Sequence, residues 1–320
     1  MRLSTNLIFS QQMQSISKSQ ASWLASGMQV SSGKRVTKPS DDPIAASQAL
    51  NILQTQTKDA QYAMAQSFAG QSLSTEENAL GNVCENIQSA LTQIIYGSTG
   101  TLNDDDRDVL ATQLQDLRDQ LMNLANTQDS NGRYIFAGYK TRQPPFISGD
   151  NGVTYQGGDE AITQQVDAQR TMTIGHAGDQ VFMSLTGNAL PEPDGSASET
   201  NVFNMLDAAI SALKTPQDGQ GDEVVQQFAD SMARVNRGLH NALNNVLSVR
   251  AEIGAQLAEL DTLGDQRQER QVILSDQLSQ LTDIDITESI SRYVMQQTAL
   301  QASYKTFSQI TQLSLFQMNR

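Results

Sequence analysis

The sequence predicts a mainly α-helical protein with a small inserted β-rich domain, built as an elongated helical rod whose N- and C-terminal helices pair as a coiled coil. Three observations predict this class. Narrow apolar stripes with three- and four-residue steps run along both ends of the chain. Long polar tracts with few aromatic residues lie between them. One block, at about 140–190, instead has short β-branched runs separated by Gly and Asp turns.

The composition favours a thin body over a thick core. Of the 320 residues, 38% are hydrophobic and 5% are aromatic, which is lean for an enzyme of this length. The net charge is −14, yet residues 1–40 carry five basic side chains and no acidic one, so the acidic excess lies in the middle of the chain. An acidic body argues against nucleic acid as a partner, because the phosphates would repel it.

No membrane insertion is expected, because no run of 18 apolar residues occurs. The N-terminus lacks the apolar core and cleavage site of a secretory signal, so the residues by themselves predict a cytoplasmic protein. The lone Cys84 excludes an internal disulfide and is interpreted as a packing residue.

A long amphipathic helix is expected over residues 3–30, and a matching stripe runs from Ile286 to the C-terminus. Two narrow stripes at opposite ends predict an N-to-C helical pair. Gln297 and Gln301 interrupt the second stripe, which predicts a pair that is marginal alone and needs further copies. An ordinary intramolecular coiled coil is the alternative. The residues expected to mediate assembly are Leu3, Leu7, Met13, Ile16, Trp23, Ile290, Tyr293, Leu300, Tyr304 and Phe307.

The segment after the first helix, SSGKRVTKPSDDPIAAS at residues 31–47, is interpreted as a connector. Gly33 can end the first helix in the left-handed conformation, and Asp42 before Pro43 is typical of an N-cap followed by the first helical position. A phosphate loop is disfavoured because Arg35 stands where a Ser or Thr would bind magnesium, and no third carboxylate follows at calcium-loop spacing. The residues expected to set the bend by pairing across the connector are Arg35, Lys38, Asp41 and Asp42.

Further helices are expected over residues 45–68, 71–97, 105–129 and 222–263, and these would form the rod. The β block, from PPFISGDNG to DQVFM, is expected at the tip of a helical hairpin. The expected domains are residues 1–40 and 283–320 for the terminal pair, 41–139 and 200–282 for the rod, and 140–199 for the β-rich outer domain.

No catalytic residue, cofactor or metal site is expected. His176 and His240 lack partners at metal-ligand spacing, and no G-x-S-x-G motif occurs. Asp283 and Asp285 are interpreted as the N-terminal boundary of the last helix instead of an acid-base pair. The alternatives from a different class are an adhesin or an enzyme that uses the β block. The enzyme would use Asp150, Asp159, Asp167 or His176.

Three stretches resemble one known family. LASGMQVSSGKRVTKPSDDPIAASQAL, residues 24–50, resembles the N-terminal signature of flagellin-like proteins, and RAEIGAQLAELDTL, residues 250–263, resembles their returning segment. NGRYIFAGYKTRQPPF, residues 131–146, is similar to the end of the rod helix in the hook-associated members that form the hook-filament junction. The resemblance covers about residues 1–146 and 222–320, whereas the β block matches only in position and size.

The resemblance implies a structural subunit of the bacterial flagellum, which a chaperone and the type III export apparatus deliver unfolded to the cell exterior. It implies assembly in a ring with copies of itself at the hook-filament junction, where the paired terminal helices line the inner tube. The implied neighbours are hook-associated protein type 1 and flagellin. A short flagellin that forms the filament itself is the alternative within the same family.

Overall fold

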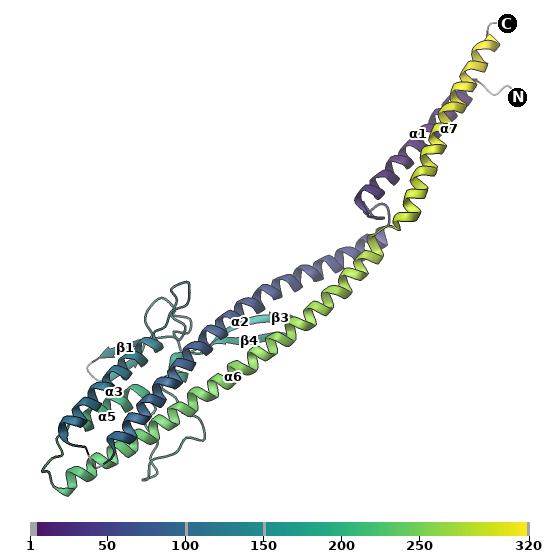
Figure 1. Cartoon of the computed structure of the whole chain (residues 1–320). Helices are drawn as coiled ribbons and strands as arrows, with labels where there is room; N and C mark the ends of the chain where they lie inside the picture. The colour runs from purple at the N-terminus through teal and green to yellow at the C-terminus, as the bar shows by residue number, and fades with distance from the viewer. Residues whose placement is uncertain (1–4, 100–101, 150–151, 319–320) are drawn as a thin grey trace. The chain divides into compact units, whose positions relative to one another are not determined.

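A computed structural model describes residues 5–99, 102–149 and 152–318. Figure 1 shows that helices make up most of this part and that strands are few and short, which confirms a mainly α protein with a small β region. The chain divides into two compact units: one consists of Met1–Ala60 and Arg267–Arg320, and the other of Gln61–Gln266. Within the described residues, no helix combines the length and the apolar character needed to cross a membrane.

The first unit contains the two terminal helices, α1 (Thr5–Ser32) and α7 (Ile286–Met318), which lie side by side (Figure 1). Both helices were expected from their apolar stripes. Gly33 follows α1 with φ of 69°, the left-handed conformation that glycine adopts without steric cost, and the helix ends there as predicted.

Two long helices belong partly to each unit: α2 (Pro43–Gly97) and α6 (Asp222–Thr282). The prediction of two separate helices over 45–68 and 71–97 is wrong, and so is the predicted end of the later helix at residue 263. Gly70 does not interrupt α2 and lies on the side that packs on α6: a Cβ there would be in ordinary contact, 4.0 Å, with a methyl carbon of Leu260. Burial of the neighbouring turns against α6 outweighs the roughly 1 kcal/mol that glycine costs a helix.

The core of the second unit repeats every seven residues. On α2 and α6 the buried side chains recur at this spacing, so each helix keeps one apolar line toward its neighbours. Two shorter helices, α3 (Asp104–Ala125) and α5 (Val202–Leu213), pack against each other and close this core. Helix α5 was not expected as a separate element. The repeating core residues are Leu73, Leu80, Ile87 and Ile94 of α2 and Met232, Leu239, Val246, Ile253 and Leu260 of α6.

The β region consists of two antiparallel hairpins. Strands β1 (Phe146–Gly149) and β2 (Gly152–Tyr155) pair with Phe146 opposite Tyr155, and β3 (Ile162–Asp167) and β4 (Arg170–Gly175) pair with Gln164 opposite Met172. The run DQVFM is not a strand as expected, because Gly178–Phe182 forms the short helix α4. Val181 and Phe182 of α4 are buried in the core.

The hairpins do not lie at the tip of the helical hairpin, which corrects the expected position. Gln66 of α2 donates its side-chain N–H to the carbonyl of Val166, and Arg170 pairs with Glu259 of α6 at 2.6 Å. Gly97, at the end of α2, instead lies under Leu213 and Met232. Gln66 and Gly97 are 31 positions apart on one helix, a distance of about 46 Å at 1.5 Å per residue, so the β3–β4 hairpin lies along the flanks of α2 and α6.

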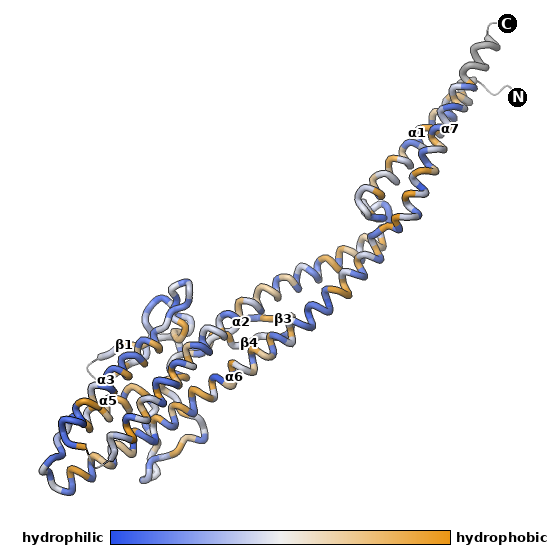
Figure 2. Tube along the Cα trace, in the orientation of Figure 1, coloured by the Kyte–Doolittle hydropathy of each residue, from blue (hydrophilic) through white to orange (hydrophobic). Residues whose placement is uncertain are grey.

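Figure 2 shows how apolar residues are distributed along these elements, with orange segments interleaved among blue ones on every long helix. Cys84 of α2 is buried in the core and has no disulfide partner, in agreement with its interpretation as a packing residue.

Candidate assembly interface and connector

The contact between α1 and α7 follows a heptad repeat. The less exposed residues of each helix recur at alternating steps of four and three, and the helices run antiparallel, since Trp23 stacks on Tyr293 at 5.7 Å and Phe9 lies 5.2 Å from Phe307. We call this contact the seam. Its residues are Gln12, Ile16, Ser19, Trp23, Ser26 and Val30 on α1, and Ser289, Tyr293, Gln296, Leu300, Ser303, Phe307 and Ile310 on α7.

Only one of the two repeating positions in the seam is consistently apolar. Ile16, Trp23 and Val30 recur every seven residues on α1, while the alternating position holds Gln or Ser, and α7 shows nearly the same division. Gly27 lets Tyr293 approach closely, because a Cβ there would lie 3.3 Å from its ring. A coiled coil stabilised by both positions would have Leu or Ile at each, so this seam gains less burial per turn.

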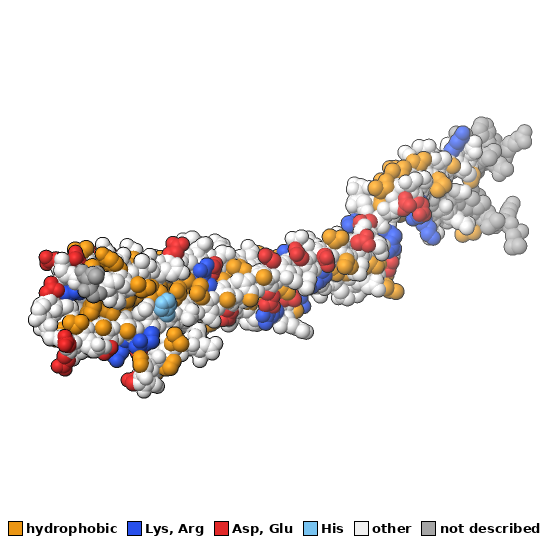
Figure 3. Space-filling view, turned by 60° about the horizontal axis from the view of Figure 1, so that its bottom comes forward, with side chains coloured by type: hydrophobic (Ala, Val, Ile, Leu, Met, Phe, Trp, Pro, Cys, Tyr) orange, Lys and Arg blue, Asp and Glu red, His pale blue; other side chains and the backbone are white. Residues whose placement is uncertain are grey.

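A second apolar line faces outward from the same two helices, and we call it the outward stripe. Large apolar side chains on it expose about half of their surface or more, from 46% for Ile290 to 63% for Ile286. Hydrophobic side chains are visible along this pair in Figure 3. Contiguous exposure of this kind marks interaction surfaces. Its residues are Leu7, Met13, Leu24 and Met28 on α1 and Ile286, Ile290, Val294 and Tyr304 on α7.

The residues predicted to mediate assembly fall into two groups, and Leu3 lies outside the described residues. Ile16, Trp23, Tyr293, Leu300 and Phe307 lie in the seam within one chain, as the intramolecular alternative requires. The exposed group is Leu7, Met13, Ile290 and Tyr304, and their role in assembly stays a prediction.

Gln297 and Gln301 do not interrupt the seam. Both are exposed, and they continue the spacing of Ile290, Val294 and Tyr304 along the outward stripe. The polar interruption that the sequence shows therefore belongs to the surface that faces away from α1.

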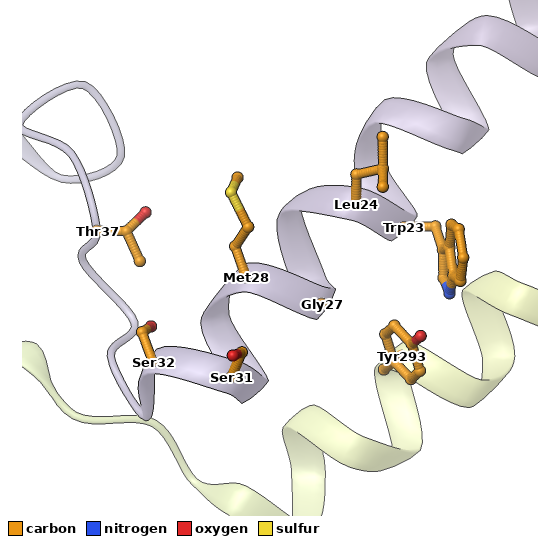
Figure 4. A pocket seen from close by; sticks show the side chains of 8 residues that line it. All are labelled: Trp23, Leu24, Gly27, Met28, Ser31, Ser32, Thr37 and Tyr293. Carbon is orange, nitrogen blue, oxygen red and sulfur yellow. The ribbon is translucent and has the colours of Figure 1, made fainter.

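A shallow hollow of about 520 Å³ opens where the outward stripe meets the end of α1. Figure 4 shows Trp23 turned toward Tyr293 of α7, whereas Leu24 and Met28 point away from that helix. Thr37 of the connector contributes to the opposite wall. The hollow is thus apolar on the α1 side and open to solvent.

The connector is held in place by contacts with residues 282–284, at the end of α6 and just before α7. The backbone N–H of Arg35 donates to the carbonyl of Thr282 at 2.6 Å, and the N–H of Ile284 donates to the carbonyl of Gly33 at 3.1 Å. Lys34 pairs with Asp283 at 2.5 Å. Residues 33–35, directly after α1, are therefore hydrogen-bonded to residues 282–284, just before α7, although the two segments are far apart in sequence.

Arg35 is the central side chain of the connector. Its guanidinium pairs with Asp42 at 3.0 Å and donates to the carbonyl of Leu281 at 2.8 Å. Asp42 also accepts the N–H of Ala45, so it caps α2 as the sequence predicted. Asp41 caps the turn instead of the helix, because it accepts the backbone N–H groups of Thr37 and Lys38.

Sequence reasoning missed Lys34 and Asp283 as a pair. Asp283 was expected to begin the last helix, but Asp285 takes that role by accepting the N–H of Glu288 at 3.0 Å. The two aspartates are only two residues apart, so the sequence offers no signal that distinguishes the cap from the partner of Lys34.

The carboxyl groups of the connector have lowered pKa values. Backbone hydrogen bonds from Lys38 to Asp41 and from Ala45 to Asp42 are the main causes, and the side chains of Thr37 and Arg35 add to them. The hydrogen bond from Lys34 lowers the pKa of Asp283. Their contribution to stability is therefore present above the ordinary value of 3.8 and is lost as the pH falls through the lower folded values.

Among the described residues, no group of three or more His, Cys, Asp or Glu side chains could hold a metal ion. Of the residues named for the enzyme alternative, Asp150 lies outside the described residues. His176 is buried and its Nδ1 lies 2.9 Å from Glu76.

Comparison with known proteins gives consistent matches over the whole length. Residues 3–141 match the family model of the bacterial flagellin N-terminal helical region, and residues 237–318 match that of the C-terminal helical region. A Salmonella typhimurium protein named flagellar hook-associated protein 3 is 56% identical over 320 residues, covering 100% of both chains. Its Escherichia coli counterpart of the same name is 55% identical over 321 residues, again with full coverage of both.

A solved structure has the same fold at lower identity. A putative flagellar hook-associated protein from Vibrio parahaemolyticus superimposes with a TM-score of 0.64 at 24% identity, over 76% of this chain and 100% of that one.

Proposed function

Because the chain belongs to the flagellar hook-associated protein 3 family, with flagellin-type helical regions at both ends, we propose that it is a structural subunit of the bacterial flagellum at the hook-filament junction. It acts by assembling with other subunits and carries no catalytic role. The names of its two full-length relatives place those proteins in the flagellum, and this chain takes the same location.

The outward stripe is the observation that carries the assembly role. A single chain leaves Leu24, Met28, Ile290 and Val294 about half exposed, although each is large and apolar. A neighbouring helix seated on the stripe would remove this surface from water, at about 25 cal/mol per Å². The seam holds α1 against α7, and the outward stripe is left for other subunits.

The partners follow from the proposed location. Copies of the chain form a ring, hook-associated protein type 1 lies on the hook side, and flagellin lies on the filament side. The chain reaches this place outside the cell through the flagellar type III export apparatus with its chaperone. The proposal keeps the sequence-based division into a terminal pair (1–40, 283–320), a rod (41–139, 200–282) and an outer β-rich part (140–199).

The connector sets the bend between the terminal pair and the rod in this proposal. Arg35 supports the role, because it contacts both the N-cap of α2 and the last turn of α6. A double substitution, Asp41→Ala with Asp42→Ala, is expected to alter junction assembly while leaving the second unit folded. Unchanged assembly and junction shape would make the connector a passive linker.

The decisive experiment separates the two faces of the terminal pair. Leu24→Ser with Met28→Ser changes two side chains that this chain leaves about half exposed, so the variant is expected to stay folded and to abolish incorporation into the junction. Electron microscopy of cells that produce only this variant should show hooks without filaments. Leu247→Ser, an exposed apolar residue of the second unit, is the matched control and should leave filaments intact.

The alternatives give different outcomes. A short flagellin would polymerise by itself into long filaments when purified, whereas the junction subunit should not. Truncation of residues 286–320 should abolish assembly, and normal filaments from that truncation would contradict the proposal.

A further inference from the structure

The second unit contains a charged cluster that the assembly role does not use. His176 follows strand β4 and is 5% exposed, and its imidazole lies between two carboxylates from different helices. Its Nδ1 is 2.9 Å from Glu76 of α2, and its Nε2 is 3.7 Å from Glu252 of α6. The cluster therefore joins three elements that are far apart in the sequence.

Glu76 is the more deeply buried partner. It is 2% exposed, and its Oε1 also accepts the backbone N–H of His176 at 3.1 Å. Among the described atoms, its other oxygen, Oε2, is buried without a hydrogen-bond partner. A buried carboxylate with so few donors depends on a nearby positive charge.

The two ring nitrogens of His176 differ in whether their contact with a carboxylate needs the charged imidazole. A neutral His176 can still donate from Nδ1 to Glu76, but Nε2 would then present a lone pair to Glu252. Among the described atoms Nε2 has no hydrogen-bond partner, so its contact with Glu252 at 3.7 Å is attractive as an ion pair only when the imidazole is protonated. Glu252 has a side chain that is 57% exposed, so it can turn to solvent when the charge on His176 is lost.

We propose that protonated His176 is a pH-sensitive latch that fastens the β3–β4 hairpin to helices α2 and α6. Protonation places one positive charge between Glu76 and Glu252, and deprotonation releases the α6 side of the contact. The hairpin has other anchors to these helices, through Gln66 and the Arg170–Glu259 pair, so it is expected to loosen without leaving the unit.

Electrostatics support the direction of the switch. Burial lowers the pKa of His176, but the hydrogen bond and charge of Glu76, together with Glu252, raise it above the ordinary value of 6.5. These two glutamates are the charged groups that act on His176 from α2 and from α6. Since the folded pKa is raised, the stabilisation is fully present below pH 6.5 and is lost as the pH rises through the folded value.

A histidine titration by NMR tests the protonation directly in the full-length protein. The chain has two histidines, so His240→Gln leaves a spectrum in which the imidazole signal belongs to His176. We expect this signal to titrate above pH 6.5, and Glu252→Gln should move its midpoint to lower pH. A midpoint at or below 6.5, or one that Glu252→Gln leaves unchanged, would overturn the latch.

Hydrogen exchange tests the mechanical consequence. After correction for intrinsic exchange rates, peptides covering residues 162–176 should lose protection as the pH rises through the His176 midpoint, while peptides from β1–β2 keep theirs. His176→Gln should abolish this difference between the hairpins, and His240→Gln, at an exposed position on α6, should preserve it. Equal pH responses of the two hairpins in the wild type would rule the latch out even if His176→Gln failed to fold.

Discussion

The two units of the chain both consist of helices with seven-residue repeats, but they bury very different amounts of apolar surface. In the second unit, Leu73, Leu80 and Ile94 of α2 are fully buried. Among the described residues of the first unit, the buried hydrophobic side chains are Ile16, Ala45, Ala49 and Leu300. A seven-residue repeat therefore does not by itself determine stability. The residues at the other positions of the heptad decide how much of each helix surface is apolar and can be buried.

The contrast suggests that the two units have different roles, folding within one chain and contact with other subunits. The second unit buries one large apolar cluster, built from its own helices and hairpins, within a single chain. The first unit has one consistently apolar position per heptad in its seam and leaves the large apolar residues of the outward stripe about half exposed. Its terminal pair is therefore suited to gain stability only when other subunits are present.

The largest expected effect comes from breaking the core of the second unit. Phe203 of α5 is fully buried and packs against the rings of Phe146 and Phe182. Phe203→Ala is expected to lower the free energy of unfolding by about 3–5 kcal/mol, measured by urea denaturation with far-UV circular dichroism. The comparison substitution in the first unit, Leu24→Ala on the outward stripe, removes a side chain that is 53% exposed and should change it by less than about 0.5 kcal/mol. Equal effects would show that the two units do not differ as described.

A second prediction uses the single tryptophan. Trp23 lies in the seam, so its fluorescence reports on the terminal pair alone, whereas far-UV circular dichroism reports on all helices. The fluorescence transition is expected at a lower urea concentration than the circular dichroism transition. Coincident transitions in dilute protein would contradict a marginal terminal pair.

The connector gives a smaller effect, of electrostatic origin. Asp283→Asn removes the partner of Lys34 and should increase the rate at which trypsin cleaves after Lys34, Arg35 and Lys38 at neutral pH. Asp276→Asn, on the exposed surface of α6, is the control and should not change the cleavage rate. In the wild type, acidification below 3.8 should loosen the connector in the same direction, because Asp283 has a lowered pKa.

The smallest expected effect tests how tightly the seam is packed. Gly27→Ala should stabilise α1 by up to about 1 kcal/mol through helix propensity, reduced by the contact of the new methyl group with Tyr293. Since Tyr293 is only half-buried, its ring can shift to make room. The midpoint of the Trp23 fluorescence transition should rise slightly, and a clear decrease would show a rigid seam.

Local signals in the sequence predicted where α1 ends and where α2 begins. Gly33 and Asp42 with Pro43 both mark boundaries that the structure contains, because caps and left-handed turns depend on a few adjacent residues. Gly70 lies between two of the predicted helices and Gly264 directly follows a predicted helix end, yet both lie inside continuous helices. Whether a glycine interrupts a helix depends on what the helix packs against, and the sequence does not show that.

The candidate interface could be predicted only in part. The apolar stripes identified the helices that would pair, but one sequence cannot show which line of a helix meets its partner and which faces outward. Ile16 and Met13 are three positions apart, yet one is buried and the other is 48% exposed. The ion pair of Lys34 with Asp283 could not be predicted either, because its two residues are nearly 250 positions apart and meet only in the folded chain.

Cys84 gives the protein a property that is useful for chemical labelling. The thiol is 3% exposed, and burial raises its pKa, so little reactive thiolate reaches a maleimide in the folded protein. A cysteine introduced on the outward stripe, for example Leu24→Cys, would thus be the one that reacts. Its rate of modification, before and after subunits assemble, would record directly whether that surface has been covered.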